Sequence, residues 1–317
     1  MILARGFVIG AAVLIAGCGL SPIQKDQVAS FSAATASVGG ATAAQFAQLR
    51  QDAVEMNAER LMLDESQAPF QFKFDEPLGA AQITQRVLAV NALQSYGDTL
   101  NKLATSDQSA DIKQSSTDLV SNFNAASAAN LTSAQETAAT DIIASLGGFF
   151  VEYQKKKAVE QIVSSYACPV DQLAALLERD FLNFGAGGGD PTRDHASQSP
   201  IAGCPFHSPR GDPAVGVLYG YEAAAGRLKD IAGGVLARKE PFEKRKEATQ
   251  AMLLAMRNLD KGKAVGRDAT AALQAMRKAN AALVGALKGN QLKVQDIKAY
   301  GDAAKQLLAS LRILAHQ

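Results

Sequence analysis

Apolar residues recur every three or four positions along almost the whole of this chain, and rarely at every second position. That spacing predicts α-helices, because side chains three and four residues apart share one helix face. The clearest run covers residues 243–287, where spacings of four and three alternate as they do in a coiled coil. Many positions of this seam hold Ala or Gly, among them Gly262 and Gly266, so we expect close approach of neighbouring helices and little room for a buried cofactor.

The same spacing predicts further helices over residues 46–63, 83–104, 112–126, 132–166, 173–184 and 217–235. Pro169 suits the first turn of one helix, Pro213 opens another, and Gly289-Asn290 turns the last two into a hairpin. Two segments interrupt the pattern: residues 69–75 alternate aromatic and polar side chains, and residues 185–213 form a long loop rich in Gly, Pro and Asp. We therefore predict an all-α fold, an elongated bundle of long antiparallel helices with one short extended segment and one long loop.

The first twenty residues have the pattern of an export signal. A single positive charge at Arg5 precedes a short apolar run, which ends in Leu14-Ile15-Ala16-Gly17-Cys18 and is short for a membrane-spanning helix. This ending resembles the lipobox of bacterial lipoproteins. The resemblance implies cleavage before Cys18 and lipidation of Cys18, for example with palmitate. In the Gram-negative sorting rule, Gly19 in place of Asp implies the periplasmic face of the outer membrane.

These observations divide the chain into a signal peptide (residues 1–17), a lipidated tether (residues 18–41) and a helical bundle domain (residues 42–317). The bundle domain contains the loop at residues 185–213.

Lipidation of Cys18 leaves two cysteines, Cys168 and Cys204, in a compartment where disulfides form. Because an even number of cysteines remains in an exported protein, we predict that these two form a disulfide that pins the long loop. The alternative is two buried free thiols.

Charge is balanced overall, with a formal net charge of +1, but it is divided unevenly along the chain. Residues 18–222 carry 13 Lys and Arg against 23 Asp and Glu, whereas residues 223–317 carry 18 against 8. The basic helices either pack beside the acidic ones or present a basic face to anionic lipid head groups or cell-wall carboxylates. The candidate residues for such a face are Arg238, Lys239, Lys244, Arg245 and Lys246.

The sequence offers no catalytic constellation, so we predict no enzyme, no cofactor and no metal site. His195 and His207 lie in the long loop with Asp190 and Asp194, but their spacing matches no metal-ligand pattern. The modest net charge and the predicted compartment argue against nucleic acid as a partner.

We therefore expect a membrane-anchored, non-enzymatic structural or protein-interaction module of the cell envelope, with an envelope protein or the cell wall as its partner. The alternative is a helical carrier for a small apolar or anionic ligand, lined by Tyr96, Tyr221, Phe149 and Phe150.

Overall fold

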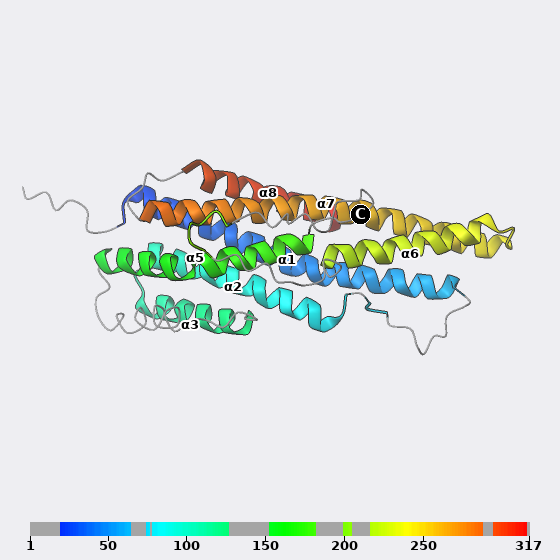
Figure 1. Cartoon of the computed structure of the whole chain (residues 1–317), viewed down its shortest axis with the longest axis horizontal. Helices are drawn as coiled ribbons and strands as arrows, with labels where there is room; N and C mark the ends of the chain where they lie inside the picture. Colours follow the sequence, from blue (N-terminus) through cyan, green and yellow to red (C-terminus); the bar gives the residue numbers. More distant parts are fainter. Residues whose placement is uncertain are drawn as a thin grey trace, which may run out of the picture.

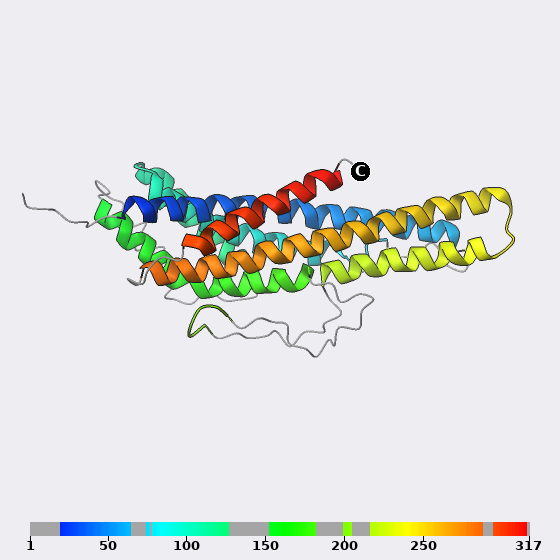
Figure 2. The ribbon, with the colours of Figure 1, turned by 90° about the horizontal axis from the view of Figure 1, so that it is seen from above.

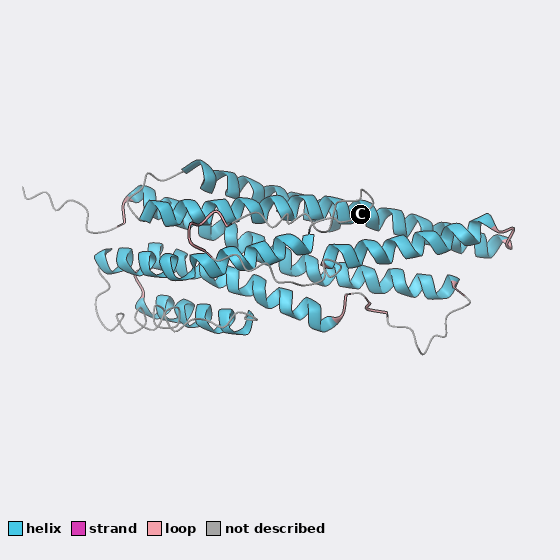
Figure 3. Ribbon diagram, viewed as in Figure 1, coloured by secondary structure: helices cyan, strands magenta, loops and turns pink. Residues whose placement is uncertain are grey.

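The computed structural model describes residues 20–64, 74–76, 78–126, 152–181, 199–204, 216–287 and 294–315. Over these residues the secondary structure is helical, without strands, which confirms the all-α prediction (Figure 3). The helices are α1 (Pro22–Leu63), α2 (Ala80–Thr105), α3 (Ser109–Ala126), α5 (Glu152–Phe181), α6 (Val217–Ala237), α7 (Phe242–Leu287) and α8 (Val294–Ala315).

The helices run roughly along one long axis, as predicted for an elongated antiparallel bundle (Figures 1 and 2). One half of the molecule contains α2, α3, α5 and α8 together with the first half of α1 and the second half of α7. The other half is slimmer and contains α6 with the remaining halves of α1 and α7. Both views show the turn between α6 and α7 projecting beyond the end of α1. We call this projecting end, residues 236–246, the α6–α7 tip.

Helices α5 and α6 follow one another along α7 (Figure 2). They meet opposite Gly266, where an added Cβ atom would lie 2.9 Å from the carbonyl oxygen of Phe181 and would overlap the side chain of Leu218. One turn away, an added Cβ on Gly262 would lie 3.1 Å from Cε1 of Tyr221. The close approach expected at these two glycines is therefore confirmed.

The predicted tether at residues 18–41 is wrong, because α1 begins at Pro22 and forms part of the bundle. The Ser21 side chain accepts a hydrogen bond from the backbone N–H of Gln24, and the Gln24 side chain accepts one from the backbone N–H of Ser21. This capping box, with Pro22 in the first turn, starts the helix firmly. Val28 and Phe31 are then fully buried in the core.

The small residues of this segment, which suggested a tether, serve close helix packing instead. An added Cβ on Gly97 of α2 would lie 3.0 Å from Cβ of Thr35, and one on Gly39 would lie 3.2 Å from Cβ of Gln94. The buried hydroxyls of Ser32 and Thr35 donate to backbone carbonyls one turn earlier in α1. Small side chains whose polar groups are satisfied internally allow α1 and α2 to touch.

Pro169 does not start a helix but lies inside α5, which corrects the prediction made for it. Proline has no N–H to donate to the preceding turn, so an interior proline disturbs the helix and bends it. Figure 2 shows α5 bending along its course. Two residues before the proline, the carbonyl of Ala167 accepts a hydrogen bond from the Asn280 side chain of α7 at 3.0 Å.

The predicted interruptions are described only in part. Within residues 69–75, Phe74 and Asp75 lie in a turn with Glu76, so the part of this segment that the structure describes is not a strand. Within residues 185–213, only residues 199–204 are described. The hairpin turn at Gly289-Asn290, the helix start at Pro213 and residues 132–151 lie outside the described residues.

Candidate functional site

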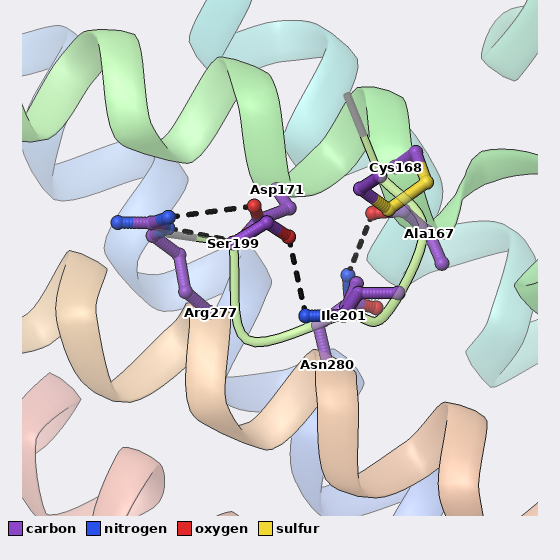
Figure 4. The surroundings of a disulfide bond; sticks show 8 residues. Ala167, Cys168, Asp171, Ser199, Ile201, Arg277 and Asn280 are labelled. Atoms are coloured by element: carbon purple, nitrogen blue, oxygen red, sulfur yellow. Dashed lines mark hydrogen bonds and ion pairs between the residues drawn. A yellow bond between two sulfur atoms is a disulfide. The ribbon is translucent and has the colours of Figure 1, made fainter. Parts of the chain in front are cut away.

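The disulfide joins Cys168 of α5 to Cys204, with an S–S distance of 1.89 Å and a Cα–Cα distance of 5.5 Å (Figure 4). The predicted pairing is confirmed, and the free-thiol alternative is wrong. The bond fastens residues 199–204 against α5, and Ile201 of this segment is buried in the core. The backbone N–H of Ile201 donates to the Ser199 hydroxyl at 3.1 Å.

A buried ion cluster lies next to the disulfide (Figure 4). Arg277 of α7 pairs with Asp171 of α5 at 2.8 Å and with Glu178 at 3.0 Å, and Gln274 donates to the other oxygen of Glu178 at 2.7 Å. The three charged side chains are at most 4% exposed. Burial by itself lowers the pKa of Arg277, but the hydrogen bonds and charges of the two acids raise it overall. The guanidinium therefore stays charged, and the cluster holds α5 and α7 in register.

One turn further along α7, Asn280 connects three helices. Its amide nitrogen donates to the Ala167 carbonyl of α5, and its amide oxygen accepts from the Tyr96 hydroxyl of α2 at 3.1 Å. Burial raises the pKa of Tyr96 well above its usual range, so the phenol remains a hydrogen-bond donor.

A second buried polar cluster lies in the slimmer half of the bundle. Asp52 of α1 pairs with Lys261 of α7 at 2.6 Å and accepts from Gln48 at 2.7 Å. The hydroxyl of Tyr221 of α6 lies 2.7 Å from Oδ1 of Asn258 and 3.4 Å from Oδ2 of Asp52. Burial, and then the charge of Asp52, raises the pKa of Tyr221. Tyr96 and Tyr221 thus belong to different clusters and do not line a common cavity; Phe149 and Phe150 lie outside the described residues.

A surface groove of about 600 Å³ runs between α2 and α3. Its lining includes the carboxylates of Asp98, Asp111 and Asp118 and one cation, Lys102; the rest consists of amides and hydroxyls. Partial burial raises the pKa of Asp98, and the charge of Lys102 opposes that shift. This acidic, polar lining does not suit the small apolar or anionic ligand of the carrier alternative.

Metal ligands do not gather within the part of the chain that the structure describes: it contains no group of three His, Cys, Asp or Glu side chains placed to hold an ion. His195 and His207 lie outside those residues, as does Cys18.

Part of the charge asymmetry of the sequence is compensated by ion pairs inside the bundle. The α7 cations Lys261 and Arg277 pair with acids of α1 and α5, which come from the acidic part of the chain. In this stretch of α7, the basic residues are therefore explained by packing against acidic residues of neighbouring helices. The first turns of α7 differ, because their cations are exposed at the α6–α7 tip.

The five basic residues singled out in the sequence all lie exposed at this tip, but they do not share one face. Arg238 and Lys239 form the turn that follows α6, and the other three lie early in α7. Lys246 is one helical turn beyond Phe242 and points the same way. Lys244, two residues beyond Phe242, points to the opposite side of the helix. The predicted basic face is therefore divided.

An apolar element on the outer face of α7 is absent from the sequence predictions. Phe242, Leu253 and Met256 are 68%, 56% and 50% exposed, respectively. They are large apolar residues that lie outside the apolar seam from which the helix is predicted. Their position off the seam is the one sequence feature that indicates an exposed apolar surface. Together with intervening polar residues they form a surface that we call the α7 stripe. Its members are Phe242, Arg245, Lys246, Thr249, Leu253, Met256 and Arg257.

Comparison with known protein families, with curated proteins and with solved structures finds no match to this chain. Among the helices described, none combines the length and apolar character needed to cross a bilayer.

Proposed function

We propose that this chain is a lipid-anchored protein of the cell envelope, held at the periplasmic face of the outer membrane through Cys18. It acts without catalysis, as a structural or interaction module that presents its α6–α7 tip to another envelope component. The observation that carries the proposal is the position of the two ends. Helix α1 begins at Pro22 at one end of the elongated bundle, and the tip projects at the other (Figure 1).

The lengths of chain involved support this arrangement. Cys18 precedes Pro22 by four residues, which can span at most about 14 Å. A lipid on Cys18 would therefore hold the end of the bundle where α1 begins. Helix α7 has 46 residues and is about 69 Å long at 1.5 Å per residue. The tip would then stand well away from the anchored cysteine.

The anchor is tested by intact mass spectrometry of the chain extracted from the membranes of its native host. We expect the mass of residues 18–317 plus acyl chains, and loss of that species in a Cys18→Ala variant. An unmodified or uncleaved chain would overturn the proposed anchor.

The tip is tested by photo-crosslinking in the same cells, with the reactive side chain placed at Lys239 in one strain and at Lys113 of α3 in another. Both positions are exposed, and only the first lies at the tip. We expect envelope material, whether protein, wall or lipid, to be captured from Lys239 and not from Lys113. Equal capture from both positions, or none from Lys239, would contradict an interaction module that works through its tip.

A further inference from the structure

The first four turns of α7 have an outer face that combines cations with large apolar side chains. The seam residues Ala248, Ala251 and Ala255 are buried, so the outer face lies opposite them. At 3.6 residues per turn, the seven residues of the α7 stripe fall within about 60° of the direction of Phe242, which lies on the side of the helix away from these alanines. All seven are exposed.

Within residues 242–257, the acidic side chains of α7 lie away from the α7 stripe. Glu243 and Glu247 are displaced from the direction of Phe242 by about 100° or more, whereas the exposed Asp260 follows the α7 stripe on the same face, one turn beyond Arg257. Over residues 242–257 the α7 stripe therefore carries three cations and no carboxylate. None of its three cations, Arg245, Lys246 and Arg257, is joined to an acid by an ion pair within the described chain, in contrast to Lys261 and Arg277 further along the same helix.

Exposed side chains of this size point to a partner with an apolar component. Phe242, Leu253 and Met256 are spread over 14 residues, which is about 21 Å of helix. They lie on the convex surface of a single helix and do not line a groove. A helix with a row of large apolar residues flanked by Lys and Arg is the pattern of segments that lie in a membrane interface.

We propose that the α7 stripe binds the surface of a bilayer containing anionic phospholipid. The guanidinium groups of Arg245 and Arg257 and the ammonium group of Lys246 would meet lipid phosphates. The three apolar side chains would enter the boundary between head groups and acyl chains. Charge complementarity and the exposed apolar row both favour this occupant over an acidic protein, which would need only the cations.

This inference deepens the proposed function and rests on it in one respect: with a lipid at Cys18, the bundle would have membrane attachments at opposite ends. Binding by the α7 stripe itself does not need the lipid. It is therefore tested on residues 19–317, which include every described residue, produced unlipidated with the disulfide formed.

The chain contains no tryptophan, so a single substitution provides a specific reporter. In a Phe242→Trp variant, we expect the emission to shift to the blue when vesicles of phosphatidylcholine and phosphatidylglycerol are added. We expect no shift with phosphatidylcholine alone. The matched control is Ile23→Trp, at an exposed apolar position (63%) at the opposite end of the molecule. Its emission should stay unchanged with both kinds of vesicle.

The charge contribution is measured by co-sedimentation with the same vesicles. Each Lys or Arg near an anionic surface contributes roughly a fivefold gain in affinity. Replacing Arg245, Lys246 and Arg257 together with Gln should therefore weaken binding roughly 100-fold. The control variant replaces Lys113, Lys278 and Lys298 with Gln, which removes the same charge from exposed positions outside the α7 stripe; it should bind nearly as well as the parent. Salt at about 0.5 M should weaken binding by the parent chain, because it screens exposed charges.

Three results would overturn the inference: equal binding to neutral and anionic vesicles, equal losses in the two triple variants, or an unshifted Phe242→Trp emission. The inference would also be overturned if the chain did not bind vesicles but captured a protein at its tip in cells. That result would assign the tip to a protein partner. None of these results bears on the Cys18 anchor, whose failure is detected separately by the mass of the chain from its native host.

Discussion

Replacing Gly266 with Ala is expected to cost stability, although Ala is the better helix former. An interior Gly→Ala change favours a helix by about 1 kcal/mol. At Gly266 the new methyl would lie 2.9 Å from the Phe181 carbonyl oxygen and would overlap Leu218. Overpacking of this kind costs about 1–3 kcal/mol, and a backbone carbonyl cannot move away by changing rotamer. The net result is a loss of up to about 2 kcal/mol.

Gly226 provides the matched control. It lies inside α6, and an added Cβ there would meet no atom within 4 Å. Gly226→Ala should therefore show the propensity gain alone. Urea unfolding followed by far-UV circular dichroism, with the disulfide intact, gives the free energy of unfolding of both variants. The difference between their two changes removes the propensity term and should equal the overpacking cost of about 1–3 kcal/mol.

A third variant tests the cause of that cost. In a double-mutant cycle, Gly266→Ala should cost less in a Leu218→Ala background than in the parent chain, because Leu218 is the side chain that the new methyl overlaps, whereas the Phe181 carbonyl remains. Equal changes in stability for Gly266→Ala and Gly226→Ala would refute the close contact between α7 and the α5–α6 junction.

Three further predictions concern the buried polar groups and the disulfide. Arg277→Met leaves Asp171 and Glu178 buried without their cation and should lower the free energy of unfolding by about 3–5 kcal/mol. Adding Asp171→Asn and Glu178→Gln should recover much of the lost stability. If urea unfolding shows the triple variant to be less stable than Arg277→Met alone, this prediction is wrong. Cys204→Ser opens a 36-residue loop and should cost about 3–4 kcal/mol, so a reductant should destabilise the parent chain but not the variant. Burial raises the pKa of Tyr300 above its ordinary value of 10.0, so its contribution to stability is present below pH 10.0 and is lost as pH rises through the folded-state pKa. Alkaline unfolding should therefore depend less on pH in Tyr300→Phe, and an unchanged dependence would contradict this assignment.

The long helices are predictable from sequence because each one buries a continuous face. The seam of α7 sets its length and its glycine contacts, and the apolar spacing elsewhere locates the later part of α1 and most of α2, α3 and α6. The disulfide is predictable from cysteine arithmetic in an exported chain. These features depend on local periodicity or on counting, and not on knowing which helices are neighbours.

The start of α1 was missed because composition was given more weight than capping chemistry. Small residues between positions 30 and 44 resemble a tether in composition. Ser21, Pro22 and Gln24, however, form the signature of a capped helix start. Pro169 fits a helix start because proline favours the first turn, and the local sequence does not show that α5 continues through it.

The ion cluster and the α7 stripe depend on tertiary contacts. Arg277 is 106 residues from Asp171 and 99 from Glu178, and no local pattern distinguishes it from the exposed Lys278 beside it. Arg245 and Lys246 carry the same charge as Arg277 but face solvent, because they lie at the α6–α7 tip, which projects beyond the end of α1 (Figure 1). Which cations are neutralised inside the bundle follows from where each neighbouring helix stops.

The meeting point of α5 and α6 gives the molecule a mechanical weak point. Where α5 ends and α6 begins, α1 and α7 both continue past the junction as unbroken helices (Figure 2). Helices α1 and α7 therefore transmit a sideways force on the slimmer half across this junction, and α7 has Gly262 and Gly266 on its inner surface there. We therefore expect a pull on the tip to flex the molecule at this joint before it separates the helices of the thicker half.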